Sequence, residues 1–192
     1  MILALPRGGV PVAFEVAKAL GAPLDVFVAR KIGAPGQREL GIGAIAEGGE
    51  VLANEAALHA LGLTSRRFAQ LAARERRELE RRIQRYRGTR ALPDMEDRDV
   101  VLVDDGFATG VTAIAALRSL RRSHARRLIL AVPVCGPDAA QRLAGVAHEV
   151  VCLAQPAFFR AVGGAYDDFS PTSDDEVVRL LECANGTARV ER

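Results

Sequence analysis

Two adjacent carboxylates, Asp104 and Asp105, directly follow an apolar run over Val100–Val103. A continuous aliphatic run of this kind is typical of a strand that is buried on both faces of a parallel sheet. The carboxylates are then expected at the carboxyl end of that strand, which borders the ligand crevice in open α/β sheets. Because neighbouring carboxylates can accept hydrogen bonds from the two cis hydroxyls of a ribose, the pattern predicts a sugar site.

The loop after the carboxylates is rich in small residues and threonines. Gly106, Ala108 and Gly110 leave room for backbone N–H groups at the start of the next helix to point at a phosphate. Thr109 and Thr112 add hydroxyl donors. A lone pair of aspartates would as readily cap a helix or hold a bare metal ion. Their combination with this loop favours a ribose-phosphate site, and the loop lacks the spacing of nucleoside-triphosphate and dinucleotide motifs.

Residues 100–112, VVLVDDGFATGVT, resemble the 5-phosphoribosyl-1-pyrophosphate (PRPP) binding signature of the type I phosphoribosyltransferases. The resemblance implies an α/β fold with a parallel sheet, helices on both of its faces and a small hood region. It also implies that Asp104 and Asp105 bind the ribose hydroxyls. The loop that would bind the 5-phosphate consists of Ala108, Thr109, Gly110, Val111 and Thr112.

Three further stretches, PRGGVP, VARKIGAP and VGGAYDDFSPTSDDEV, resemble an uncharacterised predicted branch of the same family. With the PRPP signature, the similarity covers most of the chain. Members of the family usually carry a helix before the first strand. This sequence begins at Met1, one residue before that strand, so the resemblance implies a shortened start.

A second glycine loop follows the first apolar strand, in residues 2–9, and precedes an amphipathic segment over Val10–Leu20. In the family this loop binds pyrophosphate through exposed amides, often with a non-proline cis peptide, and Arg7, Gly8 and Gly9 match it by position. Arginine can clamp two phosphate oxygens at once, and glycine tolerates unusual dihedral angles. A simple glycine turn is the alternative for this loop taken alone.

A strand is predicted over Leu24–Ala29, with Arg30 and Lys31 at its carboxyl end. The pair resembles the basic pair that reaches pyrophosphate in the family, sometimes from the neighbouring subunit of a dimer. Only two of the 26 basic residues are lysines, and Lys31 is one of them. A planar guanidinium does not replace a compact ammonium group, so a lysine beside the site indicates a need for that group. Chance retention of Lys31 explains the same observation.

Residues 32–49 are rich in glycine and lie where the family carries a flexible segment that closes over substrate. We expect a mobile lid here. The apolar residues Ile42, Ala44 and Ile45 equally suit one strand of a hairpin.

Four of the nine aromatic residues lie in residues 155–170. They are Phe158, Phe159, Tyr166 and Phe169. This region is the candidate for the hood that covers an acceptor base in related enzymes, and core packing is the alternative.

A long helix is predicted over Arg66–Arg90, with ten arginines and three glutamates. Its apolar positions would face the sheet, and Glu78 with Arg82 forms an i,i+4 pair. The apolar positions are Phe68, Leu71, Leu79 and Ile83. A nucleic-acid surface is conceivable, but a net charge of +2 and the lack of interleaved aromatics favour a solvated helix face.

The alternating pattern continues with strands at 128–132 and 149–153 and a helix at about 138–144 between them. Parallel strands with right-handed crossovers are expected. A last helix at 174–184 would be capped by Thr172 or Ser173.

The composition is that of an ordinary globular protein, since 49% of the 192 residues are apolar and 26% are charged. We expect one phosphoribosyltransferase-like domain over residues 1–192. No apolar stretch is long enough to cross a membrane and no leader is recognisable, which predicts a cytoplasmic protein. The three cysteines lack metal-ligand spacing and are expected to be reduced and mostly buried, and the three histidines are scattered.

These features predict a magnesium-dependent phosphoribosyltransferase of nucleotide metabolism, which displaces pyrophosphate from PRPP with a nitrogenous acceptor such as a nucleobase. Its catalytic residues would be Asp104, Asp105, Lys31 and Arg7. The Mg²⁺ ion would be carried by PRPP near Asp104 and Asp105, with no direct protein ligand cage. A homodimer fits the resemblance.

Two other functions stay open. The chain would be a regulatory protein if it binds PRPP or a nucleotide without catalysis and touches nucleic acid through its arginine-rich helix. Alternatively, it would act on another ribose phosphate by phosphorolysis or hydrolysis. The same residues would bind the sugar phosphate in each case.

Overall fold

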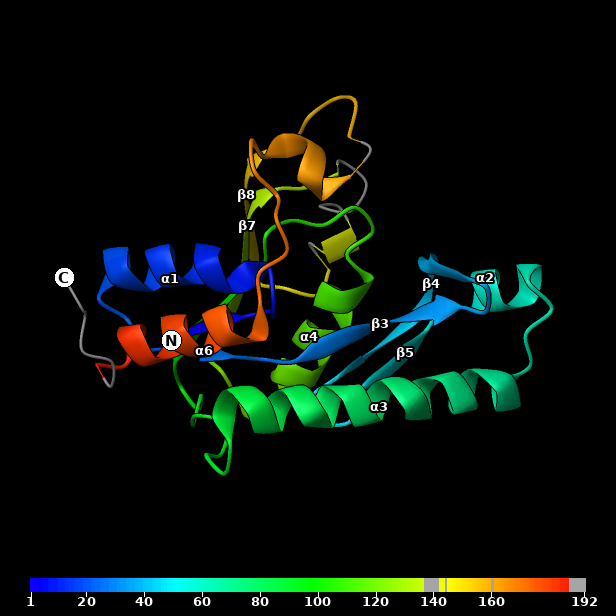
Figure 1. The fold of residues 1–192 in the computed structure, drawn as a ribbon, viewed down its shortest axis with the longest axis horizontal. Coiled ribbons are helices and arrows are strands. Elements are labelled where there is room, and N and C mark those ends of the chain that lie inside the picture. The colour runs from blue at the N-terminus through cyan, green and yellow to red at the C-terminus, as the bar shows by residue number, and fades with distance from the viewer. Residues whose placement is uncertain (137–141, 144, 160, 187–192) are drawn as a thin grey trace.

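The computed structural model describes residues 1–136, 142–143, 145–159 and 161–186, apart from the side chains of residues 38 and 39 (Figure 1). Its strands are β1 (Ile2–Ala4), β2 (Leu24–Val26), β3 (Ala29–Ala34), β4 (Gln37–Ala46), β5 (Val51–Ala53), β6 (Asp99–Val103), β7 (Arg127–Val134) and β8 (Glu149–Ala154). Its helices are α1 (Gly9–Leu20), α2 (Glu55–Ala60), α3 (Ser65–Arg87), α4 (Val111–Leu120) and α6 (Asp174–Ala184), with the 3-10 helices η1 (Arg121–Ser123) and η2 (Val162–Ala165). The helix predicted at about 138–144 lies mostly outside the described residues.

Five strands form a parallel sheet in the order β2-β1-β6-β7-β8. The strand predicted before the two carboxylates is β6, and it pairs with β1 so that Ala4 lies opposite Val103. The loops after β1 and β6 therefore leave the sheet side by side, at its carboxyl edge. This arrangement confirms the predicted α/β class.

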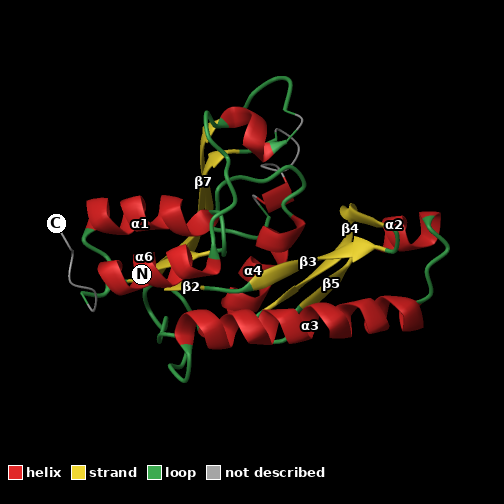
Figure 2. Ribbon diagram, in the orientation of Figure 1, coloured by secondary structure: helices red, strands yellow, loops and turns green. Residues whose placement is uncertain are grey.

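Alternate strand residues enter two hydrophobic layers, one on each face of this sheet. Leu3 and Leu102 lie in the layer that contains the apolar side of α4. Ile2 and Val103 lie in the other layer, with α1 and α6. Figure 2 shows α1 and α6 side by side, and α4 apart from them. The prediction of helices on both faces is confirmed.

Three strands form a separate antiparallel sheet in the order β3-β4-β5. The prediction of one strand over 24–29 was wrong, because the chain leaves the parallel sheet after β2 and enters the antiparallel sheet at Ala29. The backbone partner changes at the crossing: Phe27 N donates to Ala4 O at 2.9 Å, whereas Val28 O accepts from Glu47 N at 2.8 Å. Both residues of the crossing are buried, and their hydrophobicity hides the break in the sequence.

The arginine-rich helix α3 packs on β3, β4 and α6 and is the long helix along the lower side of Figure 1. Phe68 and Leu79 are buried, as their periodicity predicts, but the strands on which α3 packs belong to the antiparallel sheet. The predicted pair forms, since Arg82 Nε donates to Glu78 Oε1 at 3.0 Å. Within the described residues, no helix has both the length and the apolar character needed to cross a membrane.

A buried ion pair between Glu47 and Arg87 ties the two sheets together at the crossing. Arg87 also donates to Val26 O at 3.1 Å, and Val28 N donates to Glu47 Oε2 at 3.3 Å. From α4, Ser119 Oγ donates to Glu47 O at 2.5 Å. Burial lowers the pKa of Arg87, and these partners offset the cost of burying its charge.

Glu47→Ala should lower the free energy of unfolding by about 3–5 kcal/mol, because it leaves the Arg87 guanidinium buried without its carboxylate. Urea unfolding at neutral pH measures the loss. Glu80→Ala on the exposed side of α3 is the matched control and should change stability by less than about 0.5 kcal/mol. Equal unfolding midpoints for Glu47→Ala and the wild type would contradict the role of this pair.

Candidate active site

The loops after β1 and β6 meet at the carboxyl edge of the parallel sheet. Leu5 N donates to Val103 O at 2.8 Å, which continues the β1–β6 pairing into the first loop. The peptide bond between Pro6 and Arg7 is cis, as the family resemblance implies. Gly9 N then donates to Leu5 O at 3.1 Å, and α1 begins.

Two glycines allow the loops to touch. A Cβ atom on Gly8 would lie 1.8 Å from Asp105 Oδ2, and one on Gly9 would lie 2.7 Å from Val103 O. The atom near Gly9 belongs to the backbone, so that position requires glycine, whereas a side chain at position 8 would force the Asp105 carboxylate to turn away. The glycines thus bring the backbone of the first loop against the carboxylates of the second.

The second loop is held against β7 before it enters α4. Gly106 has a φ of +151°, and a Cβ there would lie 2.7 Å from Val134 O. The buried Phe107 donates its N–H to Val134 O at 3.3 Å. Gly110, with a φ of +71°, is the residue before α4. The loop therefore delivers the first turn of α4 next to the carboxylates.

The first turn of α4 has the chemistry of an anion site. The first N–H groups of a helix have no acceptor within the helix, and the helix dipole favours negative charge there. Ala108 and Thr109 are exposed just before this turn, and Val111 and Thr112 are half-buried within it. The sequence-predicted phosphate loop thus lies at a helix N-terminus, with Ala108 and Thr109 exposed and Gly110 buried.

Asp104 and Asp105 are partly buried neighbours of like charge. Burial raises the pKa of Asp104 well above its usual range, and the charge of Asp105 raises it further. Burial is also the main cause that raises the pKa of Asp105. The hydrogen bond from Asp105 N to Asp104 Oδ1, at 3.0 Å, favours the ionised form but does not offset this burial. Ligand hydroxyls or a cation would stabilise the ionised pair.

The aromatic segment after β8 reaches back to these carboxylates. Tyr166 donates its hydroxyl to Asp105 O at 2.5 Å, and its ring lies 5.3 Å from that of Phe169. Burial raises the pKa of Tyr166, and the charge of Asp105 adds to the rise. Phe158 is 95% exposed, so the aromatics of this segment do not form a common core. Phe158 is therefore not a core residue. Tyr166 lies beside the carboxylates, through its bond to Asp105 O.

A cavity of about 700 Å³ opens between the two loops and this segment. It joins Arg7, Gly8 and Asp105, all predicted site residues, with Tyr166 and Phe169. Its other lining residues are Pro11, Val12, Arg82, Asp168, Ser170, Pro171, Thr172 and Glu176. Arg82 was not among the predicted site residues, because its spacing from Glu78 indicates only an ordinary helix-surface pair.

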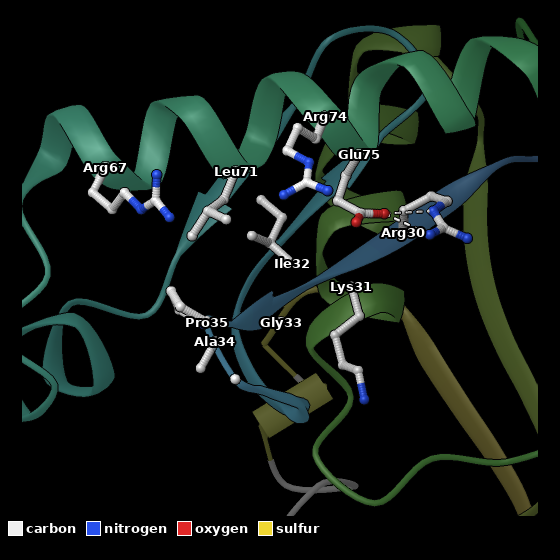
Figure 3. A pocket seen from close by; sticks show the side chains of 11 residues that line it. Arg30, Lys31, Ile32, Gly33, Ala34, Pro35, Arg67, Leu71, Arg74 and Glu75 are labelled. Atoms are coloured by element: carbon white, nitrogen blue, oxygen red, sulfur yellow. Dashed lines mark hydrogen bonds and ion pairs between the residues drawn. The ribbon is translucent and has the colours of Figure 1, made fainter.

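Arg30 and Lys31 lie on opposite sides of β3 and not at the end of a parallel strand (Figure 3). Arg30 donates to Glu75 Oε2 of α3 through Nε at 2.9 Å and through its terminal nitrogen at 2.5 Å. Both basic residues line a second cavity of about 540 Å³, along α3. The structure therefore does not place this pair together with Arg7 and Asp105.

The glycine-rich segment over 32–49 contains the β3–β4 hairpin, which turns at Pro35 and Gly36. Ile42, Ala44 and Ile45 are buried in β4, so the hairpin interpretation is confirmed. Closure of this segment over a ligand stays a prediction.

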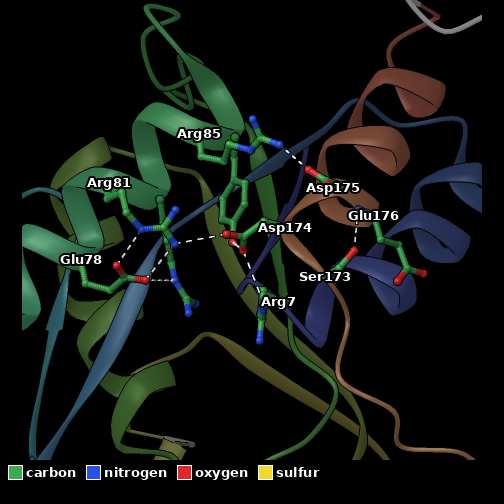
Figure 4. A network of polar contacts seen from close by, with 10 residues as sticks. Arg7, Glu78, Arg81, Arg85, Ser173, Asp174, Asp175 and Glu176 are labelled. Carbon is green, nitrogen blue, oxygen red and sulfur yellow. Dashed lines mark hydrogen bonds and ion pairs between the residues drawn. The ribbon is translucent and has the colours of Figure 1, made fainter.

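Arg7 is linked to α3 and α6 through Asp174 (Figure 4). Arg7 lies 3.7 Å from Asp174 Oδ1, which also accepts the Tyr86 hydroxyl at 2.6 Å, and Arg81 donates to Asp174 Oδ2 at 3.2 Å. The bond from Tyr86 is the main cause that lowers the pKa of Asp174. Ser173 caps α6, as predicted, and accepts from Glu176 N at 3.0 Å.

The described residues contain no group of three or more His, Cys, Asp and Glu side chains that could hold a metal ion. Asp104 and Asp105 nevertheless offer carboxylate oxygens, the ligand type that Mg²⁺ prefers. Because Mg²⁺ binds through one or two carboxylates together with substrate phosphates, the donor set fits an ion that arrives with a phosphorylated ligand.

Asp104→Asn should raise the free energy of unfolding at neutral pH by roughly 0.5–2 kcal/mol, the range of single stabilising substitutions. The raised pKa of Asp104 means that ionisation destabilises the fold once the pH exceeds the ordinary carboxyl value, and the amide removes this cost. The gain should therefore shrink as the pH falls toward 4. Urea unfolding over this pH range tests it, with the exposed Asp94→Asn as control. A variant less stable than the wild type at neutral pH would refute the argument.

Comparison with known proteins agrees with this geometry. A family model described as "Phosphoribosyl transferase domain" matches residues 1–169. Two Mycobacterium tuberculosis proteins, named "Putative phosphoribosyl transferase MT0597" (strain CDC 1551) and "Putative phosphoribosyl transferase Rv0571c" (strain H37Rv), are 49% identical over 185 residues. The match covers 96% of this chain but only 42% of each of those proteins. The crystal structure of TT1426 from Thermus thermophilus matches with 46% identity and a TM-score of 0.76, over 94% of this chain and 85% of that one. The chain thus belongs to the phosphoribosyl transferase domain family.

Proposed function

We propose that this chain transfers the 5-phosphoribosyl group of PRPP to a nitrogenous acceptor, a nucleobase, and releases pyrophosphate. The observation that carries the proposal is the contact of Gly8 with Asp105, which joins the two family loops at one cavity. The ribose and the leaving group of PRPP are adjacent in one molecule. A site for PRPP therefore needs this adjacency, whereas a site for a simple phosphate does not.

Each end of PRPP has a matching group in the site. Asp104 and Asp105 accept hydrogen bonds from the two ribose hydroxyls, which supply the donors that these carboxylates need. The 5-phosphate binds the loop over Ala108–Thr112 and the first turn of α4. The pyrophosphate binds Arg7 and the amides of Gly8 and Gly9.

The catalytic effect of these groups is electrostatic. As the bond between the anomeric carbon and the pyrophosphate oxygen breaks, the sugar ring becomes positively charged and the leaving oxygen negatively charged. Asp104 and Asp105 lie where the ring charge develops, and Arg7 lies where the pyrophosphate departs. Bound Mg²⁺ supplies further neutralisation of the pyrophosphate charge. No side chain is assigned as a general base.

The acceptor is proposed to bind against Tyr166 and Phe169. Their rings form a tilted pair at 40° in the wall of the cavity, and each retains exposed surface. Aromatic faces of this kind stack on flat heterocycles. The hydroxyl of Tyr166 is held by Asp105 O, which fixes the ring beside the ribose site.

Replacing both carboxylates, Asp104→Asn with Asp105→Asn, should weaken PRPP binding at least about a hundredfold, because two charge-assisted contacts to the ribose are lost. Titration calorimetry with PRPP and Mg²⁺ measures binding, and pyrophosphate release measures turnover. The double variant Glu80→Gln with Glu96→Gln removes the same charge from exposed positions and should bind as the wild type does. Wild-type turnover by the aspartate double variant would refute the site.

Lys31 lines a cavity other than that of Arg7 and Asp105, so its proposed contact with the pyrophosphate needs closure of the 32–49 segment. Lys31→Ala should then lower kcat about tenfold or more. Arg30→Ala should instead lower stability by roughly 1 kcal/mol, because its partner Glu75 is left behind on α3. Steady-state kinetics and thermal unfolding separate the two effects. If Lys31→Ala altered only the unfolding temperature, Lys31 would be a structural residue.

A further inference from the structure

Arg82 is a cation of the PRPP cavity that belongs to neither family loop. It projects from α3, a helix outside the parallel sheet and its two loops, and lines the cavity together with Arg7 and Asp105. Its side chain is only 15% exposed. Burying a guanidinium costs free energy unless it has a partner. The partners of Arg82 therefore indicate its role.

Glu78 fixes one edge of the Arg82 guanidinium. Arg82 Nε donates to Glu78 Oε1 at 3.0 Å. Within the described part of the chain, the Arg82 side chain forms no other hydrogen bond. Arg81 also binds Glu78, through Nε at 2.7 Å and a terminal nitrogen at 3.0 Å. The bond from Arg81 is the main cause that lowers the pKa of Glu78 to about 2, so the carboxylate is ionised at neutral pH. Arg82 lines the cavity, and we expect a ligand to contact its terminal nitrogens, which carry four N–H donors.

The same network holds Arg7. Asp174 accepts from Arg81 at 3.2 Å and from Tyr86 at 2.6 Å, and it lies 3.7 Å from Arg7 (Figure 4). Arg7 and the Tyr86 hydroxyl thus meet at the same carboxylate oxygen, and Arg82 lines the same cavity as Arg7. Two carboxylates, Glu78 and Asp174, thus position three arginines, and one positive charge remains in excess.

The cavity also contains acids, which restricts the chemistry of the ligand. Asp105, Asp168 and Glu176 line it together with Arg7 and Arg82. A bare anion would meet these carboxylates, whereas a diphosphate that carries Mg²⁺ presents oxygens to the arginines and a cation to the acids. We propose that Arg82 is a second arginine for the magnesium-bound diphosphate group, placed by Glu78 to bind the leaving group jointly with Arg7.

This inference rests on the proposed function and adds a residue from a third element to the site. Arg7 approaches the diphosphate from the loop after β1, and Arg82 approaches it from α3. Because α3 also packs on β3 and β4, its position depends on the hairpin that carries Lys31. A diphosphate held between the loop and α3 would therefore link the parallel sheet to the antiparallel sheet.

The test is calorimetric binding of inorganic pyrophosphate in the presence of Mg²⁺. Arg82→Gln should weaken binding about tenfold or more, because a charge-assisted, two-point contact is lost. Arg82→Lys keeps the charge and the apolar stem but not the planar fork, and it should bind with intermediate affinity. Arg77→Gln removes the same charge from an exposed position on the same helix and should stay within about twofold of the wild type. Thermal unfolding checks that each variant is folded. If Arg82→Gln does not fold, the affinity of Arg82→Lys for pyrophosphate is the test.

The possible results separate this inference from the proposed function. If the wild type fails to turn over PRPP but binds pyrophosphate through Arg82, the transferase reaction is refuted and the diphosphate site stands. If the wild type turns over PRPP and Arg82→Gln binds pyrophosphate with unchanged affinity, Arg82 is only a helix-surface partner of Glu78. Absence of pyrophosphate binding by the wild type also overturns the role of Arg82.

Discussion

The candidate site depends on the contact between the backbone of Gly8 and the carboxylate of Asp105. A Cβ atom at position 8 would overlap Asp105 Oδ2 at 1.8 Å, so glycine at this position lets the Asp105 carboxylate keep its orientation beside the first loop. The contact is possible because β1 and β6 are neighbours in register, which sends both loops out at the same edge of the sheet. The glycine at position 8 and the pairing of β1 with β6 thus both bring the two loops together. Together they place the amides of the first loop, proposed to bind the pyrophosphate, beside the carboxylates proposed to bind the ribose.

Much of this could be predicted from the sequence, because the parallel strands are short apolar runs that end in polar loops. The run before Asp104 and the run before Arg7 both identify a strand and its carboxyl end without any long-range information. The two glycine loops and the cap of α6 at Ser173 are local features, and each was confirmed where it was predicted. Local patterns therefore sufficed for the elements of the site and for the edge on which they lie.

The errors and omissions concern contacts between distant residues. Phe27 and Val28 continue an apolar run, yet the chain changes sheets there, because Glu47 and Arg87 supply the polar partners for the crossing. Nothing near residue 27 in the sequence signals those partners. Likewise, Tyr166 reaches Asp105 and Tyr86 reaches Asp174 only after the chain has folded. Spacing on one helix identifies a pair, but it does not show which cavity the pair faces.

The carboxylates of the site differ in how many hydrogen-bond donors the protein supplies to them. This difference indicates which groups a ligand must supply. Burial raises the pKa values of Asp104 and Asp105, so the protein supplies too few donors for both to ionise easily. Hydrogen bonds lower the pKa values of Glu78 and Asp174, so the carboxylates that hold the arginines are already satisfied. A ligand must therefore bring hydroxyl donors or a cation to one side and anionic oxygens to the other. PRPP with Mg²⁺, the ligand that we propose, carries both, since its ribose hydroxyls and its diphosphate are on neighbouring carbons.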